Sequence, residues 1–293
     1  MQIVLFGKNG QVGWELQRIL PSLGRMISLD YDDLDLADLK ALQARLDELK
    51  PDLIVNASAY TAVDRAESER DLAMKINGQA PGVMAEAARK FGAMLLHYST
   101  DYVFDGTKGS PYVETDVPNP LNMYGESKLA GENAIQQVAN AYVILRTSWV
   151  YSTRLQSGFV QKVLAWARQN ETLRIVEDQI GCPTWARMLA VVTGLLIAKG
   201  GDQPDEYFKR HHGIYHVAGK GSASRFEWAK AILTYDPRRG EQRASHLEPA
   251  VSSDFPVPAV RPMYSVLSCA HFESTFGFRI PNWMESLKLA MGE

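Results

Sequence analysis

Short apolar runs alternate with helical stretches through the first half of the chain. Runs that read as continuous hydrophobic stretches are typical of parallel strands buried on both faces, because right-handed crossovers place a helix over each pair of strands. The apolar runs lie at residues 3–6, 26–29, 53–55, 94–98 and 142–145, and the helical stretches between them at 12–20, 39–49 and 81–91. The alternation predicts an α/β fold with a doubly wound parallel sheet.

The alternation becomes less regular after Arg146. Stretches rich in glycine, proline and charge, such as 199–204 and 236–242, separate further helical patterns at 159–168, 188–198, 226–233 and 283–291. We therefore expect a first domain over residues 1–150 and a smaller C-terminal lobe over 151–293, with some later segments returning to the first sheet.

Composition excludes several classes of protein. The 293 residues are 46% hydrophobic and 22% charged, as in ordinary globular proteins. The net charge of -3 leaves no basic field for nucleic acid or an anionic membrane surface. No apolar run approaches the roughly 18 to 20 residues of a spanning helix. The chain opens without the pattern of a secretory signal, and two distant cysteines make no disulfide framework, so we expect a cytoplasmic protein.

A glycine-rich loop follows the first apolar run. Its glycines, Gly7, Gly10 and Gly13, have the spacing of a dinucleotide-binding turn. There the first glycine permits the turn, the second lets the backbone approach a pyrophosphate, and the third lets helix and strand pack closely. The N–H groups that open the helix, near Gln11 and Val12, then face the phosphates. The loop predicts that residues 1–150 form a Rossmann-like dinucleotide-binding domain.

Asp30 ends the second apolar run, where an acid meets the ribose hydroxyls of adenosine. A carboxylate there favours NADH over NADPH because it repels a 2′-phosphate. Asp32, Asp33 and Asp35 make the segment more acidic, although such residues also suit turns and helix caps. We therefore expect NADH, or both NADH and NADPH, as the cofactor.

The strongest signal for chemistry is Tyr124 followed four residues later by Lys128. Residues at this spacing project from one face of a helix, and a nearby ammonium stabilises a tyrosine phenolate. Ser99, Thr100 and Asp101 end the fourth apolar run, at the edge where open parallel sheets bind ligands. A hydroxyl there would hold the substrate oxygen that Tyr124 protonates. The pattern predicts Tyr124 and Lys128 as catalytic residues, with a hydroxyl of Ser99 or Thr100 beside them.

These motifs resemble those of the extended short-chain dehydrogenases/reductases that act on nucleotide sugars. They are Gly7-x-x-Gly10-x-x-Gly13, Asn56-Ala57-Ser58-Ala59, Ser99-Thr100-Asp101-Tyr102-Val103-Phe104 and Tyr124-x-x-x-Lys128. Further segments resemble the branch of that family that reduces dTDP-4-dehydrorhamnose: Thr61-Ala62-Val63-Asp64-Arg65-Ala66-Glu67, Pro120-Leu121-Asn122-Met123-Tyr124-Gly125, Arg146-Thr147-Ser148-Trp149-Val150-Tyr151, Asp178-Gln179-x-Gly181-x-Pro183-Thr184 and Arg261-Pro262. The resemblance covers nearly the whole chain.

The resemblance implies that the 4-keto group of dTDP-4-dehydro-L-rhamnose is reduced by hydride from NADH or NADPH. Tyr124 would donate the proton, Lys128 would hold the nicotinamide ribose and lower the pKa of Tyr124, and Thr100 would orient the keto oxygen. Residues 151–293 would then mainly bind the substrate. The substrate contacts implied are Thr100, Asp101, Trp149 and Arg261. The cofactor contacts implied are Gly7, Gly10, Gln11, Val12, Gly13, Asp30, Asp35, Leu36, Ala59, Tyr60, Thr61, Tyr98, Tyr124 and Lys128.

Two of these features have a second interpretation. Arg261 suits bidentate contact with a phosphate, and a surface ion pair fits the sequence as well. Some members of the family use Mg²⁺, and Glu15 lies in a matching segment, but a carboxylate on a first helix is more often exposed and solvated. Arg187 lies near a position where some members carry an acidic residue. We therefore expect no metal site, and a monomer or a homodimer whose partner is a small nucleotide sugar.

Two alternative functions stay open. One is a reductase of another nucleotide 4-keto-6-deoxysugar, because the loops that select base and sugar carry no clear signature. The other is a non-catalytic regulatory subunit that binds a nucleotide. The intact set of Thr100, Tyr124 and Lys128 argues against the second.

Overall fold

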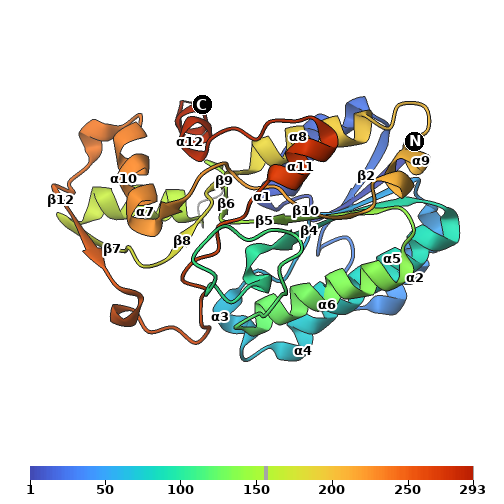
Figure 1. The fold of residues 1–293 in the computed structure, drawn as a ribbon, viewed down its shortest axis with the longest axis horizontal. Coiled ribbons are helices and arrows are strands. Elements are labelled where there is room, and N and C mark those ends of the chain that lie inside the picture. Colours follow the sequence, from blue (N-terminus) through green and yellow to red (C-terminus); the bar gives the residue numbers. More distant parts are fainter. Residues whose placement is uncertain (155–157, 293) are drawn as a thin grey trace.

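A six-stranded parallel sheet lies between two layers of helices in the computed structural model, which describes residues 1–154 and 158–292 (Figure 1). The α/β fold class is confirmed, and each of the five predicted apolar runs is a strand. Neighbouring strands are parallel throughout. Their order is β10 (Gly213–His216), β5 (Tyr142–Thr147), β4 (Met94–Thr100), β3 (Leu53–Asn56), β1 (Gln2–Phe6) and β2 (Arg25–Leu29).

Alternate residues of each strand face opposite helical layers. In β1, Ile3 and Leu5 belong to one hydrophobic cluster and Val4 and Phe6 to the other, which explains why the run is apolar throughout. The first cluster includes residues of α1 (Gln11–Ile19) and α8 (Ala186–Ala198). The second includes residues of α2 (Leu39–Leu49), α5 (Ala80–Phe91) and α6 (Met123–Val138).

The second half of the chain adds an edge strand and a smaller group of elements. β10 pairs with β5 in parallel, so residues 213–216 extend the first sheet. The group beside the sheet contains α7 (Phe159–Gln169), α10 (Arg225–Tyr235) and the parallel pair β7 (Thr172–Val176) and β12 (His246–Ala250), at the left of Figure 1. Two short pairs are β6 (Val150–Tyr151) with β9 (Thr184–Trp185) and β8 (Ile180–Gly181) with β11 (Ala223–Ser224).

The remaining helices are short. Three of them, α3 (Val63–Ala66), α4 (Arg70–Ala73) and a π-helical turn (Met74–Gln79), lead into α5, and the others are α9 (Pro204–Arg210), α11 (Ala270–Phe276) and α12 (Trp283–Met291). Short 3₁₀ turns occur at Leu20–Ser22, Asp101–Val103, Arg239–Glu241 and Ser252–Asp254. Within the described residues, no helix has the length and apolar character needed to cross a membrane.

The turn from β1 into α1 requires its first and third glycines. Gly7 has a φ of +87°, and a Cβ there would lie 2.7 Å from the backbone nitrogen of Ser58. A Cβ on Gly13 would lie 1.9 Å from the carbonyl oxygen of Gly7. The loop therefore lies tight against the start of the helix and against the segment after β3.

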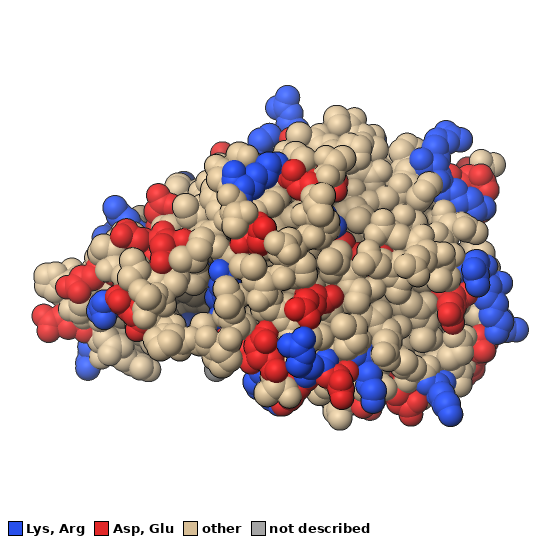
Figure 2. Space-filling model, turned by 60° about the horizontal axis from the view of Figure 1, so that its bottom comes forward, with Lys and Arg blue, Asp and Glu red and all other residues tan. Residues whose placement is uncertain are grey.

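Charged side chains of both signs are mixed on the molecular surface. On the face shown in Figure 2, Lys and Arg lie among Asp and Glu, and neither sign forms a large patch. The view agrees with the small net charge of -3 and shows no extended basic surface on this side of the molecule.

Candidate active site

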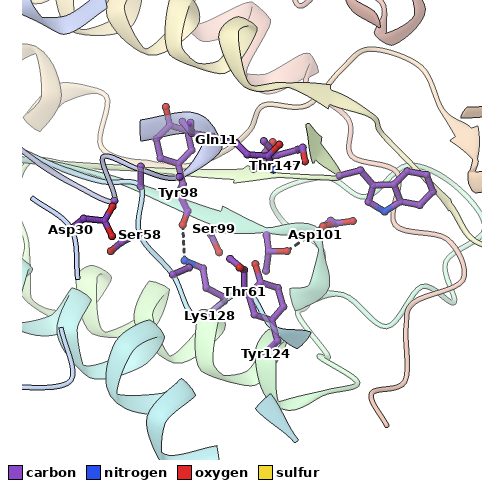
Figure 3. A pocket seen from close by; sticks show the side chains of 18 residues that line it. Gln11, Asp30, Ser58, Thr61, Tyr98, Ser99, Asp101, Tyr124, Lys128 and Thr147 are labelled. Atoms are coloured by element: carbon purple, nitrogen blue, oxygen red, sulfur yellow. Dashed lines mark hydrogen bonds between the residues drawn. The ribbon is translucent and has the colours of Figure 1, made fainter. Parts of the chain in front are cut away.

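A pocket of about 470 Å³ lies at the carboxyl ends of the central strands, and we call it the strand-end pocket (Figure 3). The order of the sheet reverses between β1 and β3, which is where open α/β sheets bind ligands. The pocket brings together the predicted residues Gly7, Gly10, Gln11, Val12, Asp30, Ala59, Thr61, Tyr98, Thr100, Asp101, Tyr124, Lys128 and Trp149. It also includes Ala57, Ser58, Ser99, Thr147 and Val150, which the sequence analysis named only as parts of motifs.

Tyr124 and Thr100 meet in the middle of this pocket. Asn122 caps α6 by accepting a hydrogen bond from the N–H of Gly125 at 2.9 Å, which places Tyr124 in the first turn of the helix. Burial raises the pKa of the Tyr124 hydroxyl, and a hydrogen bond with the Thr100 side chain lowers it in part. The net direction is upward, so Tyr124 holds its proton at neutral pH.

Lys128 lies one helical turn further along α6 and is almost fully buried. Its Nζ donates a hydrogen bond to the carbonyl oxygen of Tyr98 at 2.7 Å and lies 3.2 Å from Nε2 of His97. Burial lowers the pKa of Lys128 to about 8, although the carboxylate of Glu132 raises it in part. Burial thus brings the pKa of Lys128 closer to neutral pH than that of an exposed lysine.

Asp101 forms the end of the pocket opposite Asp30 in Figure 3. Its Oδ2 accepts hydrogen bonds from the hydroxyls of Ser148 at 2.8 Å and Ser265 at 2.5 Å. Burial raises the pKa of Asp101, against the lowering effect of these hydroxyls. The side chain is therefore fixed in place by both halves of the chain.

Trp149 lies at the same end in an uncommon backbone conformation. Its φ of +45° is in the left-handed region, which a bulky residue rarely adopts. The guanidinium of Arg225 lies 3.6 Å from the centre of the indole ring, a cation–π contact. Burial lowers the pKa of Arg225 to about 10.

The opposite end of the pocket has the features of a dinucleotide site. No side chain caps α1 at Gly10, so the N–H groups that open the helix face the pocket side of the glycine loop. Asp30 accepts a hydrogen bond from the backbone N–H of Asn9 at 2.8 Å, which ties the acid to this loop. A second cavity of about 180 Å³ shares several of these residues and extends to Asp35, Leu36 and Tyr60.

The acidic residues after β2 have different partners. Asp33 accepts a hydrogen bond from the N–H of Asp30 at 2.8 Å and pairs with Lys8 at 2.6 Å. The Lys8 hydrogen bond lowers the pKa of Asp33. Asp35 accepts a hydrogen bond from the N–H of Ala37 at 2.8 Å. Asp33 and Asp35 thus act as turn residues, and Lys8 brings a cation close to Asp30.

Five predicted residues lie outside the strand-end pocket: Gly13 in the glycine loop, Asp35, Leu36 and Tyr60 at the second cavity, and Arg261. The Tyr60 hydroxyl donates a hydrogen bond to Glu69, which raises the pKa of that tyrosine. Arg261 makes a bidentate ion pair with Asp64, at 3.0 and 2.9 Å, and lines a separate cavity of about 490 Å³. The side chain of Tyr102 is hydrogen-bonded to both Arg261 and Arg225, so both guanidinium groups lie near one hydroxyl.

Glu15 corrects one expectation. An exposed, solvated carboxylate was expected, but Glu15 is 6% exposed and pairs with Arg187 at 3.1 Å. The reason is that α1 packs against α8, whose first turn carries Arg187. Among residues 1–154 and 158–292, no cluster of three or more His, Cys, Asp or Glu side chains could hold a metal ion.

Sequence reasoning missed three functional candidates. Arg225 directly precedes a predicted helix, and nothing in its neighbourhood signals a contact with Trp149, 76 positions earlier in the chain. Asn56 was noted only as part of a motif and His97 only as a histidine without metal spacing. The sheet pairs these two residues directly across β3 and β4.

Comparison with protein families gives a match over the whole chain. Residues 1–293 match the model of the RmlD substrate binding domain. The dTDP-4-dehydrorhamnose reductase of Burkholderia thailandensis is 41% identical over 295 residues, which cover 99% of this chain and 98% of that protein.

Solved structures give the same result. The crystal structure of a dTDP-4-dehydrorhamnose reductase from Clostridium acetobutylicum has a TM-score of 0.89 and 35% identity, and the match covers 100% of this chain and 99% of that one. The Bacillus anthracis dTDP-4-dehydrorhamnose reductase, solved in complex with NADP, has a TM-score of 0.87 and 34% identity over 98% of this chain and 97% of that one.

Proposed function

The chain belongs to the RmlD substrate binding domain family, together with dTDP-4-dehydrorhamnose reductases, and from that premise we propose that Tyr124 is the proton donor of its reaction. The reaction is reduction of the 4-keto group of dTDP-4-dehydro-L-rhamnose with NADPH or NADH, which gives dTDP-L-rhamnose. The observation that carries the proposal is the meeting of Tyr124 with Thr100 beside Lys128, at the carboxyl ends of the strands.

The residues present fit a nicotinamide dinucleotide. A Cβ at Gly7 or Gly13 would collide with backbone, so the loop leaves bare N–H groups for a pyrophosphate, and Asp30 is held at that loop for a ribose. Asp35, Leu36 and Tyr60 would line the adenosine side, and Ala59, Thr61 and the Tyr98 carbonyl the nicotinamide side. A bound cofactor supplies the hydride that the reduction needs.

Tyr124 supplies the proton. The upward shift of its pKa means that the hydroxyl is protonated when substrate arrives, as a donor must be. When hydride reaches carbon 4 of the sugar, the keto oxygen becomes an alkoxide, and the proton of the Tyr124 hydroxyl moves to that oxygen. Thr100 is close enough to hold the same oxygen, because its side chain is hydrogen-bonded to the Tyr124 hydroxyl.

The substrate is held at the end of the pocket formed by both halves of the chain. Asp101, fixed by two serines, and Trp149 would contact the sugar. Arg225 and Arg261, which both lie near the Tyr102 hydroxyl, would bind the diphosphate. Binding requires Arg261 to exchange its carboxylate partner Asp64 for phosphate oxygens.

The test is absorbance at 340 nm with the purified chain, NADH or NADPH, and enzymatically generated dTDP-4-dehydro-L-rhamnose. We expect cofactor oxidation that requires the sugar, with dTDP-L-rhamnose as product. Oxidation with a different nucleotide 4-keto-6-deoxysugar only would move the assignment to that substrate. Cofactor binding with no turnover on any keto-sugar would contradict the proposal and favour a regulatory subunit.

The cofactor preference, location and oligomeric state are part of the same proposal. Asp30 favours NADH. Lys8 pairs with Asp33, which is hydrogen-bonded to the backbone of Asp30, so its ammonium would lie close to a 2′-phosphate bound at Asp30. We therefore expect both cofactors to work. The ratio of kcat/KM values for NADH and NADPH tests this expectation, which fails if one is preferred by several orders of magnitude. We further propose a cytoplasmic monomer or homodimer with the domain division near residue 150.

A further inference from the structure

His97 links the catalytic lysine to the neighbouring strand. It is fully buried on β4, with Nε2 lying 3.2 Å from Nζ of Lys128 and Nδ1 lying 3.0 Å from Nδ2 of Asn56 on β3. The three side chains thus form one chain of polar atoms, from Asn56 through the imidazole to the lysine.

The orientation of Asn56 follows from a backbone donor. Its Oδ1 accepts hydrogen bonds from the N–H of Ser58 at 3.1 Å and from the Ser58 hydroxyl at 2.9 Å. A backbone N–H can only donate, so the amide oxygen must face Ser58 and the NH₂ group must face His97. Nδ1 of His97 therefore accepts a hydrogen bond from Asn56.

This arrangement fixes the tautomer of His97. Burial, followed by the charge of Lys128, holds the pKa of His97 well below its usual range, so the ring is neutral and carries a single N–H. Because Nδ1 accepts, that N–H lies on Nε2 and points at Nζ of Lys128. An ammonium has three donors and no acceptor, whereas a neutral amine has a lone pair that can accept this hydrogen bond.

We propose that Asn56 and His97 are positioning residues that disfavour the ammonium form of Lys128. Their role rests on the proposed function: Tyr124 must regain a proton in every turnover, and a neighbouring group that exchanges protons near the working pH serves that step best. Charging Lys128 fully would require His97 to change tautomer and Asn56 to turn its NH₂ group towards the Ser58 N–H.

The other charged groups around Lys128 act in the opposite direction or are already paired. On α6, Glu132 favours the ammonium, but its carboxylate also accepts hydrogen bonds from Arg146 of β5 and Ser99 of β4. Tyr124 stays protonated, and the Tyr98 carbonyl accepts a hydrogen bond from either form of the lysine. His97 is thus the neighbour whose proton position distinguishes the two forms.

Two substitutions place a hydrogen-bond acceptor, instead of the N–H donor of His97, towards Nζ of Lys128. In Asn56→Asp, a carboxylate keeps the hydrogen bonds from Ser58 and accepts from Nδ1–H of His97, which leaves the Nε2 lone pair towards Nζ. In His97→Gln, an amide oxygen can accept from Nζ without any added charge. His216→Gln is the matched control, because His216 is also a fully buried histidine but lies outside the strand-end pocket.

The first measurement is ¹⁵N NMR of the histidine rings without substrate, at about pH 9, where wild-type Lys128, with a pKa of about 8, is mostly neutral. We expect the Nε2–H tautomer for His97 in the wild type and Nδ1–H in Asn56→Asp, with His97→Gln identifying the signal. A wild-type Nδ1–H tautomer would overturn the inference. The NMR readout needs no turnover, so it tests the inference even if the protein is not a reductase. An active reductase whose His97 carries its proton on Nδ1 would refute the inference and leave the proposed function intact.

The second measurement is the pH dependence of kcat. Activity should fall as Lys128 loses its proton, and this alkaline limb should move to higher pH by about one unit or more in both Asn56→Asp and His97→Gln. It should not move in His216→Gln. A shift in Asn56→Asp alone would show that the added charge, and not the tautomer, is responsible, and an unmoved limb in both variants would contradict the proposal directly.

Discussion

Arg261 already has a partner, which a ligand at this side chain must displace or share. The sequence suggested that Arg261 either binds phosphate or makes an ion pair, and the structure shows the ion pair with Asp64. The Asp64 hydrogen bond raises the pKa of Arg261, so the guanidinium is charged at any pH used in an assay. In the proposed function, Arg261 pairs with Asp64 in the free protein and with the diphosphate when the substrate is bound.

Replacing Arg261 by alanine should raise KM for the nucleotide sugar about 10- to 100-fold, the loss expected for one charged hydrogen-bonding group. The value of kcat should change by only a few-fold, because Arg261 does not line the strand-end pocket. Steady-state kinetics in the 340 nm assay measure both constants. Arg45→Ala, which removes a surface arginine of α2 that pairs with Glu48, should change neither constant. A normal KM in Arg261→Ala would remove the diphosphate assignment.

Among the elements, α6 carries Tyr124 and Lys128, two of the three proposed catalytic residues, and is tied to the sheet by a buried ion pair. Both oxygens of Glu132 accept hydrogen bonds from Arg146 of β5, at 2.9 and 2.6 Å, and Oε1 also accepts from the Ser99 hydroxyl of β4 at 2.5 Å. Neither charged group is more than 2% exposed. The pair fixes the register between α6 and the two strands that end in the pocket.

Arg146→Met should lower the free energy of unfolding by about 3–5 kcal/mol, because it leaves the Glu132 carboxylate buried without its partner. Adding Glu132→Leu should restore much of this loss, since an apolar pair of similar volume needs no desolvation of charge. Urea unfolding followed by circular dichroism measures both values. Equal stability of the single variant and the wild type would show that α6 does not depend on this pair.

The elements differ in how far the sequence could predict them. The runs at 3–6 in β1, 53–55 in β3 and 94–96 in β4 are apolar because both faces of the sheet are covered, so these strands were recognised. β10 has only four residues, Gly213–His216, and follows the charged segment of α9. Its place beside β5 depends on a pairing between residues about 70 positions apart, which no local pattern carries.

The candidate site divides in the same way. Gly7, Thr100, Tyr124 and Lys128 lie in motifs that follow strands or open helices, so local patterns predicted their position. The contacts of Trp149 with Arg225, and of Asn56 with Lys128 through His97, arise only when separate segments pack. Buried polar groups of this kind have no sequence signature, because their partners are set by the three-dimensional arrangement.

At the scale of the whole molecule, two buried histidines link folding to pH. Burial lowers the pKa of His216 to about 3, compared with 6.5 for an exposed histidine, and shifts His97 in the same direction. Below pH 6.5 the unfolded chain takes up protons at these positions while the folded chain does not. Acid therefore favours the unfolded state.

The free energy of unfolding should fall between pH 6.5 and about 4.5 by roughly 1.4 kcal/mol per pH unit for His216, and His97 should add to the fall in the same direction. The carboxylates lose their charge mainly below this range, so the effect of the histidines can be separated. Urea titrations at several pH values should show a weaker pH dependence in His216→Gln. His246→Gln, which replaces an exposed histidine, should leave the dependence unchanged. An unchanged slope in His216→Gln would mean that this residue is not neutral in the folded protein.

The most direct test of Tyr124 as the proton donor is the kcat of Tyr124→Phe. It is compared with the kcat of the wild type, with dTDP-4-dehydro-L-rhamnose and each reduced cofactor. The variant keeps the aromatic ring and its edge-on contact with Tyr102 but lacks the hydroxyl that would donate the proton. We expect kcat to fall about 10²- to 10⁴-fold, while the Kd of the cofactor changes little because the glycine loop, Asp30 and Lys128 are intact. A Tyr124→Phe protein that reduces the sugar at nearly the wild-type rate would contradict the account.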